Sequence, residues 1–191
     1  MADMKRIGYG QVEPNHLSAQ YTGQIYAQLP AQTYTAAAGN TPASTDNIAV
    51  LENGQFLKYN YAGGRASVDG DGEWMLVFNE VKLYDERRQN YKDFAMKASE
   101  MADNMIYPRL LKTNVGDIFT TNTFRTSGSA TVTGPDAEIT MPELAVNNYV
   151  TIDAGWLKKA NSKPDSGICF QVVKVYTLAD EQDAVKLQRI Q

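Results

Sequence analysis

The most regular hydrophobic pattern in the chain lies between residues 72 and 84. Residues 74–78 form an unbroken apolar run, rich in aromatic and branched side chains and too short for a buried helix. From Asn79 onward polar and apolar residues alternate, so that Asn79, Val81 and Leu83 would lie on the same face of a strand. Because successive side chains of a strand point to opposite faces, this pattern predicts one long strand at the centre of a β core, buried on both faces first and on one face afterwards.

Two other patterns predict hairpins. The dipeptide Asn53-Gly54 separates the apolar runs 48–51 and 56–61, and Asn-Gly between such runs is typical of a tight β-turn. A single helical turn over 48–51 that ends at Gly54 is the competing interpretation. Near the end of the chain, the alternating segments 168–178 and 184–190 flank a short acidic stretch, which predicts a terminal hairpin.

Further strands are expected in the second half of the chain. Residues 110–111 and 118–124 predict two strands joined by a tight turn over 115–117, and the segments 139–141 and 149–153 add two more candidates. The stretch 127–135, rich in Ser, Thr and Gly, is expected to be an exposed loop or a short edge strand.

Two segments allow more than one interpretation. The apolar spacing from Tyr91 to Met105 fits one face of a helix, while residues 94–97 fit a short strand equally well. Residues 69–73 superficially resemble a calcium loop. Their glycine comes too early for that motif and Glu80 misses its last ligand position, so a tight turn before the central strand is the better interpretation.

The first 47 residues differ from the rest of the chain. Gly and Pro interrupt any periodicity, and the small residues of 35–45 read as a linker. A floppy terminus is one interpretation. The other is an arm that becomes ordered on a partner, because tyrosines are costly to leave in water and are enriched at interfaces.

These patterns together predict a mainly β protein. We expect a single β-barrel or β-sandwich domain over residues 48–191, preceded by an extended N-terminal arm and linker over 1–47. A short helix or loop insertion is expected near residues 85–105.

Composition narrows the function. The chain has 191 residues, a net charge of −4 and only 21% charged residues, and its pI is about 5.0. An acidic chain without a clustered basic surface argues against a nucleic-acid partner. No apolar run is long enough to span a membrane and no signal-peptide pattern follows Met1, so we expect synthesis in the cytoplasm.

The chain offers few groups for catalysis. His16 is the only histidine and Cys169 the only cysteine, which argues against a catalytic triad, a histidine-cluster metal site and a thiolate zinc site. Cys169 lies in an apolar run and is expected to be a buried, inert thiol. Glu73 and Glu80 would point to opposite faces of a strand, which does not suit a glycosidase pair. We therefore expect no enzymatic activity, no cofactor and no metal.

Five blocks of sequence together resemble a group of small virion proteins of tailed bacteriophages. These are head decoration or auxiliary capsid proteins encoded near the major capsid gene. The blocks are 22–30 (TGQIYAQLP), 51–56 (LENGQF), 72–80 (GEWMLVFNE), 112–122 (KTNVGDIFTTN) and 171–180 (QVVKVYTLAD).

The resemblance implies a non-enzymatic, mostly β structural protein on the phage head, made in the host cytoplasm. It implies contacts with the major capsid protein that stabilise the shell, and self-association around capsid symmetry axes is a further expectation. It carries over no functional residues. From the composition of the arm, the residues expected to contact the capsid are Tyr9, Tyr21, Ile25, Tyr26, Leu29 and Tyr34.

The alternative is a virion-displayed module that binds a host surface or a carbohydrate. Trp156 is its best candidate contact, because it follows a predicted strand in a loop-like context. Packing of Trp156 against the sheet is the ordinary interpretation of the same residue.

Overall fold

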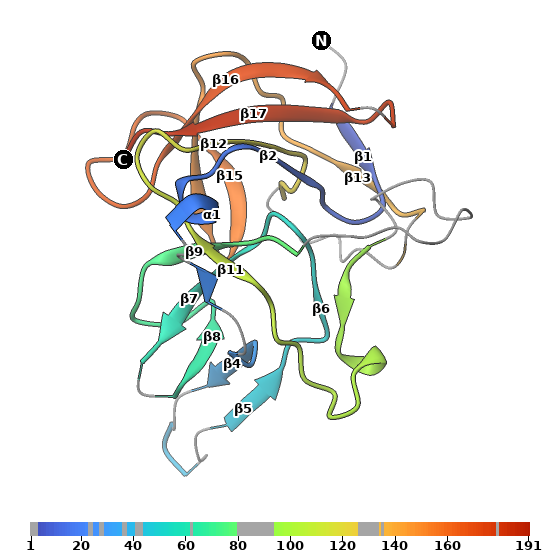
Figure 1. The fold of residues 1–191 in the computed structure, drawn as a ribbon, viewed down its shortest axis with the longest axis vertical. Coiled ribbons are helices and arrows are strands. Elements are labelled where there is room, and N and C mark those ends of the chain that lie inside the picture. Colours follow the sequence, from blue (N-terminus) through green and yellow to red (C-terminus); the bar gives the residue numbers. More distant parts are fainter. Residues whose placement is uncertain are drawn as a thin grey trace.

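The computed structural model describes residues 4–22, 25–26, 29–35, 38–40, 44–61, 63–79, 94–125, 134, 136–178 and 180–191, with the backbone alone at 22, 25–26 and 34–35. Within these residues the protein is mainly β (Figure 1). Its helical elements are α1 (Ser18–Thr22) and the short 3-10 turn η2 (Ala98–Glu100).

Two antiparallel sheets form the body of the molecule, one above the other in Figure 1. The five-stranded sheet has the order β3 (Ile25–Tyr26), β11 (Leu110–Lys112), β9 (Trp74–Val77), β7 (Phe56–Asn60), β8 (Arg65–Ser67). The six-stranded sheet has the order β15 (Trp156–Ala160), β14 (Tyr149–Asp153), β16 (Phe170–Thr177), β17 (Asp183–Arg189), β12 (Ile118–Thr121), β2 (Val12–His16).

Three two-stranded pairs complete the described part of the chain. They are β1 (Lys5–Ile7) with β13 (Glu138–Thr140), β6 (Val50–Leu51) with β10 (Met96–Lys97), and β4 (Gln32–Thr35) with β5 (Ser44–Asn47).

The prediction of a central strand is confirmed for Trp74–Val77 but is wrong for Phe78 and Asn79, which follow the end of the strand. β9 is the middle strand of the five-stranded sheet, and both of its faces are covered. Leu76 and Phe78 belong to a core shared with the six-stranded sheet, while Met75 and Val77 belong to a second core on the other face. The strand ends at Val77, and the predicted continuation over 80–84 lies outside the described residues.

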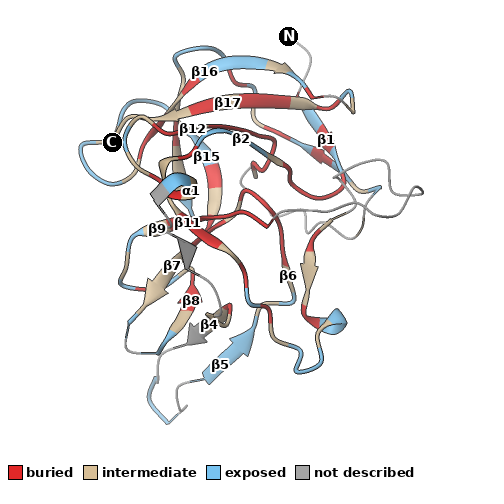
Figure 2. Cartoon of the chain, in the orientation of Figure 1, coloured by how far each residue is buried: buried red, intermediate tan, exposed pale blue. Residues whose placement is uncertain are grey.

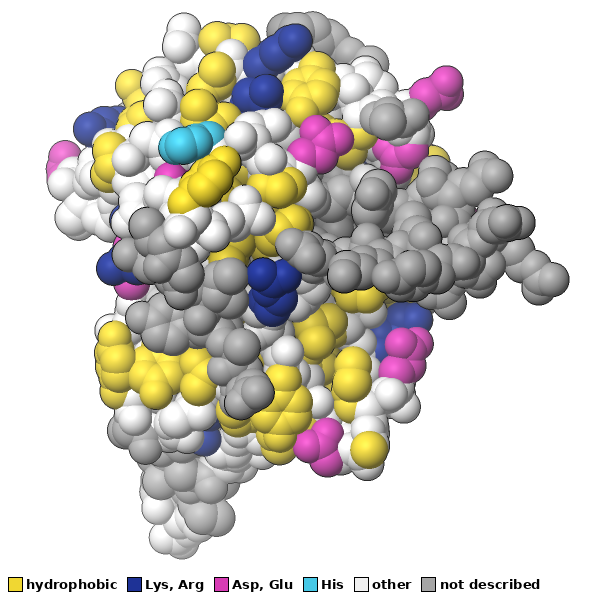
Figure 3. Space-filling model, in the orientation of Figure 1, with side chains coloured by type: hydrophobic (Ala, Val, Ile, Leu, Met, Phe, Trp, Pro, Cys, Tyr) yellow, Lys and Arg dark blue, Asp and Glu magenta, His cyan; other side chains and the backbone are white. Residues whose placement is uncertain are grey.

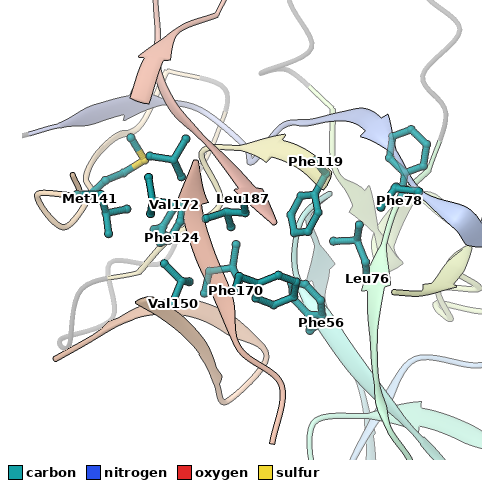
Figure 4. Packing of buried hydrophobic residues seen from close by; sticks show 14 of the residues in the cluster. Phe56, Leu76, Phe78, Phe119, Phe124, Met141, Val150, Phe170, Val172 and Leu187 are labelled. Atoms are coloured by element: carbon teal, nitrogen blue, oxygen red, sulfur yellow. The ribbon is translucent and has the colours of Figure 1, made fainter. Parts of the chain in front are cut away.

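The larger core lies between the two sheets (Figure 4). Phe56 of β7 packs against Phe170 and Phe119 of the other sheet, with ring centroids 5.8 and 6.4 Å apart. These aromatic rings and the surrounding aliphatic side chains are fully buried. Burial of this size is the main force that holds the two sheets together.

The prediction of a hairpin around Asn53-Gly54 is wrong. A turn forms there, and only Gly54 has positive φ (88°), as in a type II turn, whereas a two-residue type I′ hairpin needs positive φ at both positions. The flanking strands do not pair with each other: β6 pairs with β10, and β7 with β9 and β8. Tertiary partners therefore decide this pairing against the local signal.

The terminal hairpin is confirmed, because β16 and β17 pair along their length with a bulge between Val172 and Lys174. The strands expected at 110–111 and 118–124 also exist, but the turn between them carries the chain from one sheet to the other. In the insertion, the short-strand alternative holds for β10 and the long helical stripe is wrong for residues 94–105. Residues 85–93 lie outside the described part.

The N-terminal region is packed more closely than a free arm. β1 pairs with β13 and β2 with β12, and the core between the sheets includes Met4, Leu17 and Ala19. The boundary at residue 47 stays a prediction, but residues 4–22 are built into the sheets formed by the rest of the chain.

Candidate interaction surface

The N-terminal region supplies the outer strands of the molecule. β2 is the last strand of the six-stranded sheet, and β3 is the last strand of the five-stranded sheet. β4 and β5 form a hairpin that extends from the lower end of the molecule in Figure 1. An edge strand exposes backbone N–H and C=O groups, which makes it a natural place for contacts with another chain.

Helix α1 presents an exposed tyrosine next to the β2 edge. Leu17 and Ala19 anchor this single turn in the core. The backbone N–H of Ser18 donates to Asp117 Oδ1 at 3.0 Å, and Asn114 Nδ2 donates to Ser18 Oγ at 2.7 Å. One side of α1 is therefore fixed, and the other side is free to present its side chains.

Three exposed side chains make up what we call the Tyr21 patch: His16 at the end of β2, Tyr21 in α1, and Val115 in the turn between β11 and β12. Tyr21 is 77% exposed and Val115 68% exposed. The rings of His16 and Tyr21 lie 5.9 Å apart, and the single histidine (cyan) borders apolar side chains in Figure 3. An exposed aromatic ring is a suitable anchor for a protein partner.

The β4–β5 hairpin offers a different kind of surface. All four residues of β5 are exposed (Figure 2). The hairpin is tied to the body by polar bonds, from Arg65 Nη1 to Thr45 Oγ1 (3.1 Å) and from Asn47 Nδ2 to the Asn104 carbonyl (2.8 Å). On β5 a partner would meet the backbone and small polar side chains.

The predicted contact residues do not form one cluster. Tyr21 is exposed, Tyr9 is 3% exposed and packs with Ala95 and Ile139, and Leu29 is half-buried against the second core. The side chains of Ile25, Tyr26 and Tyr34 lie outside the described part, although their backbones belong to β3 and β4. Of the described side chains in this set, only Tyr21 is strongly exposed. Tyr9 contributes to the packing of the fold.

A buried ion pair lies where the N-terminal strand meets the rest of the chain. Arg6 Nη2 is 2.9 Å from Glu52 Oε2, and the two side chains are 0% and 4% exposed. The same Glu52 oxygen accepts the Gly10 backbone N–H at 2.8 Å. Burial lowers the pKa of the Arg6 guanidinium, and the Glu52 charge partly offsets this effect. Among the described residues, Arg6 Nε and Nη1 have no hydrogen-bond partner.

Because Gly10 has no side chain, its backbone can lie close to the segments that contain Asn53 and Thr123. A Cβ atom at Gly10 would lie 2.1 Å from Thr123 Oγ1 and 2.7 Å from the Asn53 carbonyl oxygen. Thr123 Oγ1 itself donates to that carbonyl at 2.7 Å. The tight packing identifies this cluster as a structural junction, with no room around Gly10 for a ligand.

Trp156 does not lie in a loop. It begins β15, directly after a turn in which Ala154 and Gly155 both have positive φ (46° and 83°). The side chain is half-buried, and the Arg125 guanidinium lies 3.9 Å from the ring centroid. Arg125 therefore occupies the position over the ring that a stacked sugar would need. Of the stretch 127–135, predicted to be an exposed loop or a short edge strand, only residue 134 is described.

The candidate catalytic groups lie apart from one another. Cys169 is fully buried, as expected, and burial raises the pKa of its thiol. Glu73 forms ion pairs with Arg189 at 2.9 Å and Lys112 at 3.0 Å, which ties the start of β9 to the end of β17. Within the described ranges, no three His, Cys, Asp or Glu side chains are grouped to hold a metal ion.

Sequence reasoning missed the Arg6–Glu52 junction. The two residues are 46 positions apart, and neither stands in a recognisable motif. The one usable signal was the crowding of glycines near the start of the chain, which marks places of close backbone approach.

In the part of the chain that the structure describes, no helix is long and apolar enough to cross a membrane. Comparison with protein-family models, with curated proteins and with solved structures finds no match.

Proposed function

We propose that this chain is a structural, non-enzymatic virion protein that binds the outside of a tailed-phage capsid. It would stabilise the shell through contacts with subunits of the major capsid protein. The expected location is the phage head, with the host cytoplasm as the place of synthesis and assembly. The sequence blocks described above support the family, and the structure contributes a surface through which the protein could act.

The observation that carries the proposal is the position of the N-terminal region at the edges of both sheets. β2, β3 and the β4–β5 hairpin lie at the rims, where they can reach neighbouring subunits without disturbing the core. Accessory capsid proteins stabilise a shell by burying surface across subunit boundaries, and strand edges and hairpins bury much area per residue.

The Tyr21 patch is the anchor we assign to this contact. Tyrosine brings a large, stiff apolar area and a polar hydroxyl, which suits it to the centre of an interface. The β4–β5 hairpin would add main-chain hydrogen bonds around this anchor.

The finer architecture belongs to the same proposal. We treat the protein as one barrel-like or sandwich-like unit, with both large sheets sharing one core. A single bridge between Phe124 and Leu157 brings the chain after β12 to β15, at the far end of the six-stranded order. This curvature is consistent with a partly open barrel.

A carbohydrate-binding module is the weaker alternative. Its best contact, Trp156, is half-buried and shares its ring with Arg125. Glycan binding by the isolated protein, lost in a Trp156→Ala variant, would favour this alternative over the capsid role.

The capsid role is tested with capsids that lack the protein. We expect Tyr21→Ala to weaken co-sedimentation with such capsids by about tenfold or more, because truncation of a central aromatic anchor costs about 2 kcal/mol. Unfolding by urea should be nearly unchanged, because Tyr21 is 77% exposed.

Tyr61→Ala is the matched control. Tyr61 is also a strongly exposed tyrosine (70%), but it follows β7 of the other sheet. Equal binding by Tyr21→Ala, Tyr61→Ala and the unchanged protein would remove the Tyr21 patch from the contact. Failure of the unchanged protein to bind any capsid would overturn the proposed function itself.

A further inference from the structure

In the described part of the chain, strand β16 has one edge that pairs with no other strand over most of its length. β17 pairs with it throughout, but β14 pairs only through Tyr149 with Gln171 and Val150 with Phe170. The turn before β14 adds backbone bonds to Val172. From Val173 to Thr177 no described strand covers the second side, and Figure 1 shows β16 at the upper rim of the molecule.

This edge is apolar and weakly protected. Val173 is 42% exposed, Val175 36% exposed, and Val146 in the adjoining turn 53% exposed. Natural edge strands are usually blunted by proline, charges or bulges, because unpaired backbone groups recruit other strands. The opposite edge of the same sheet follows this rule, since β2 contains Pro14 among exposed polar residues. β16 carries only one bulge and Lys174.

We propose that the β16 edge pairs with β16 of a second copy of this chain. The two strands would run antiparallel about a two-fold axis through Val175. This register places Val175 opposite Val175 of the second copy, Lys174 opposite Tyr176, and Val173 opposite Thr177. Residues 173–177 are symmetric about this centre, so the whole free edge is used.

Charge and strand length select this register. Lys174 already lies opposite Lys186 of β17, and the two ammonium groups are 5.5 and 5.7 Å from the Tyr176 ring. A centre at Lys174 would place two ammonium groups directly opposite each other, which is unfavourable. A centre at Tyr176 would require Leu178, which is buried and lies beyond the end of β16. A centre at Val175 avoids both problems and gives each Lys174 an aromatic neighbour.

The predicted contact is isologous and small. A two-fold interface uses the same patch on both copies, and five residues a side bury far less than the roughly 1,200 Å² of a stable complex. Association in dilute solution should be weak. It would become strong where copies are held side by side, because the effective concentration is then high. The inference concerns contact between copies and is tested without any capsid.

Cysteine cross-linking of the full chain tests the register. In an antiparallel pair, opposite Cα atoms lie about 4.5–5.5 Å apart, which fits a disulfide. We expect Val175→Cys to form a disulfide-linked dimer under mild oxidation at least about tenfold faster than Thr177→Cys, whose mates would be about 13 Å apart. Cys169 is fully buried and should not compete.

Tyr61→Cys serves as the control for random collision, because Tyr61 is exposed (70%) and follows β7 of the other sheet. Cross-linking of Val175→Cys no faster than Tyr61→Cys would overturn the proposed pairing. Cross-linking of Thr177→Cys as fast as Val175→Cys would overturn the two-fold centre. Near-ultraviolet circular dichroism confirms that each variant is folded. Slower cross-linking of Val175→Cys when the oxidation is carried out in mild urea, below the unfolding transition, would support a weak native contact.

Discussion

At the scale of single residues, the buried Arg6–Glu52 pair is the most demanding feature of the protein. Two charges are removed from water, and part of the guanidinium has no hydrogen-bond partner within the described part of the chain. Such a pair adds little net stability, but loss of one partner is costly because it leaves an uncompensated charge. The pair therefore fixes the position of the N-terminal strand more than it stabilises the fold.

Replacement of Glu52 tests this interpretation. Glu52→Gln keeps an acceptor for the Gly10 N–H but leaves Arg6 charged and buried, so we expect a loss of about 3–5 kcal/mol in the free energy of unfolding in urea. Glu138→Gln is the control, because its partner Lys5 is 55% exposed and such a pair is worth about 1 kcal/mol or less. Equal effects of the two substitutions would contradict the role of the buried pair.

A second residue-scale feature is Tyr176 on the outer face of the six-stranded sheet. Its hydroxyl donates to Glu13 Oε2 at 3.0 Å and is hydrogen-bonded to Thr120 Oγ1 at 2.7 Å, and so links β16 to β12 and β2. Burial raises the pKa of Tyr176 above its ordinary value of 10.0; Glu13 raises it further, while the Thr120 bond lowers it. The folded state therefore holds the phenolic proton more tightly than the unfolded state.

This difference predicts a specific pH dependence. The stabilising contribution of Tyr176 is complete below about pH 10 and is lost as the pH rises through the raised value. We expect Tyr176→Phe to be less stable than the unchanged protein at neutral pH by about 1 kcal/mol, with a gap that narrows above about pH 10. Urea unfolding at a series of pH values measures it, with Tyr61→Phe as the control. A gap independent of pH would contradict the assignment.

At the scale of elements, two turns show how local signals and tertiary contacts compete. Asn53-Gly54 has the residues of a hairpin turn, yet its flanking strands pair elsewhere. Ala154-Gly155 lacks the usual residues but forms the tight hairpin between β14 and β15. The Gly155 carbonyl accepts the Phe56 N–H at 2.8 Å, so this turn is held by the opposite sheet.

The strain at Ala154 can be relieved. A non-glycine residue at φ 46° is in the left-handed region, which is costly for alanine. We expect Ala154→Gly to raise the free energy of unfolding by about 0.5–1 kcal/mol. The higher chain entropy of glycine in the unfolded state reduces this gain. Ala145→Gly, at an exposed position without positive φ, should destabilise or leave stability unchanged. A loss of stability in Ala154→Gly would show that the left-handed turn is not strained.

At the scale of the whole molecule, one shared core should make the two sheets unfold together. Phe56, Leu76 and Leu111 of the five-stranded sheet pack with side chains of the six-stranded sheet in one cluster. Neither sheet could keep its inner face buried without the other. A single cooperative transition is the expected consequence.

The two tryptophans allow a direct test. Trp74 lies in β9 and Trp156 in β15, so Trp74→Phe and Trp156→Phe variants each leave one fluorescent probe in one sheet. We expect the urea transition of each variant to coincide with that variant's far-ultraviolet transition. Adding Phe56→Ala should lower the stability seen by both probes by about 3–5 kcal/mol. Different midpoints for the two probes would show that the sheets unfold independently.

Of the candidate surface, the sequence predicted Tyr21 as one of six contact residues, because tyrosine is costly to leave in water and is enriched at interfaces. It failed for Tyr9, which is buried by Ala95 and Ile139 from remote parts of the chain. It could not foresee the free edge of β16 either. That edge depends on where β14 leaves its neighbour, which no local pattern records.

The sequence by itself determined the β class, the central strand at 74–77 and the terminal hairpin. Each of these follows from the order of polar and apolar side chains along adjacent residues, as an unbroken apolar run or as alternation, which is local information. Only the tertiary structure decided that β11 and β12 enter different sheets, that residues 4–22 join the core, and that Arg6 meets Glu52. These contacts join segments distant in the chain, and their free energy comes from burial and charge pairing that exist only after the sheets have come together.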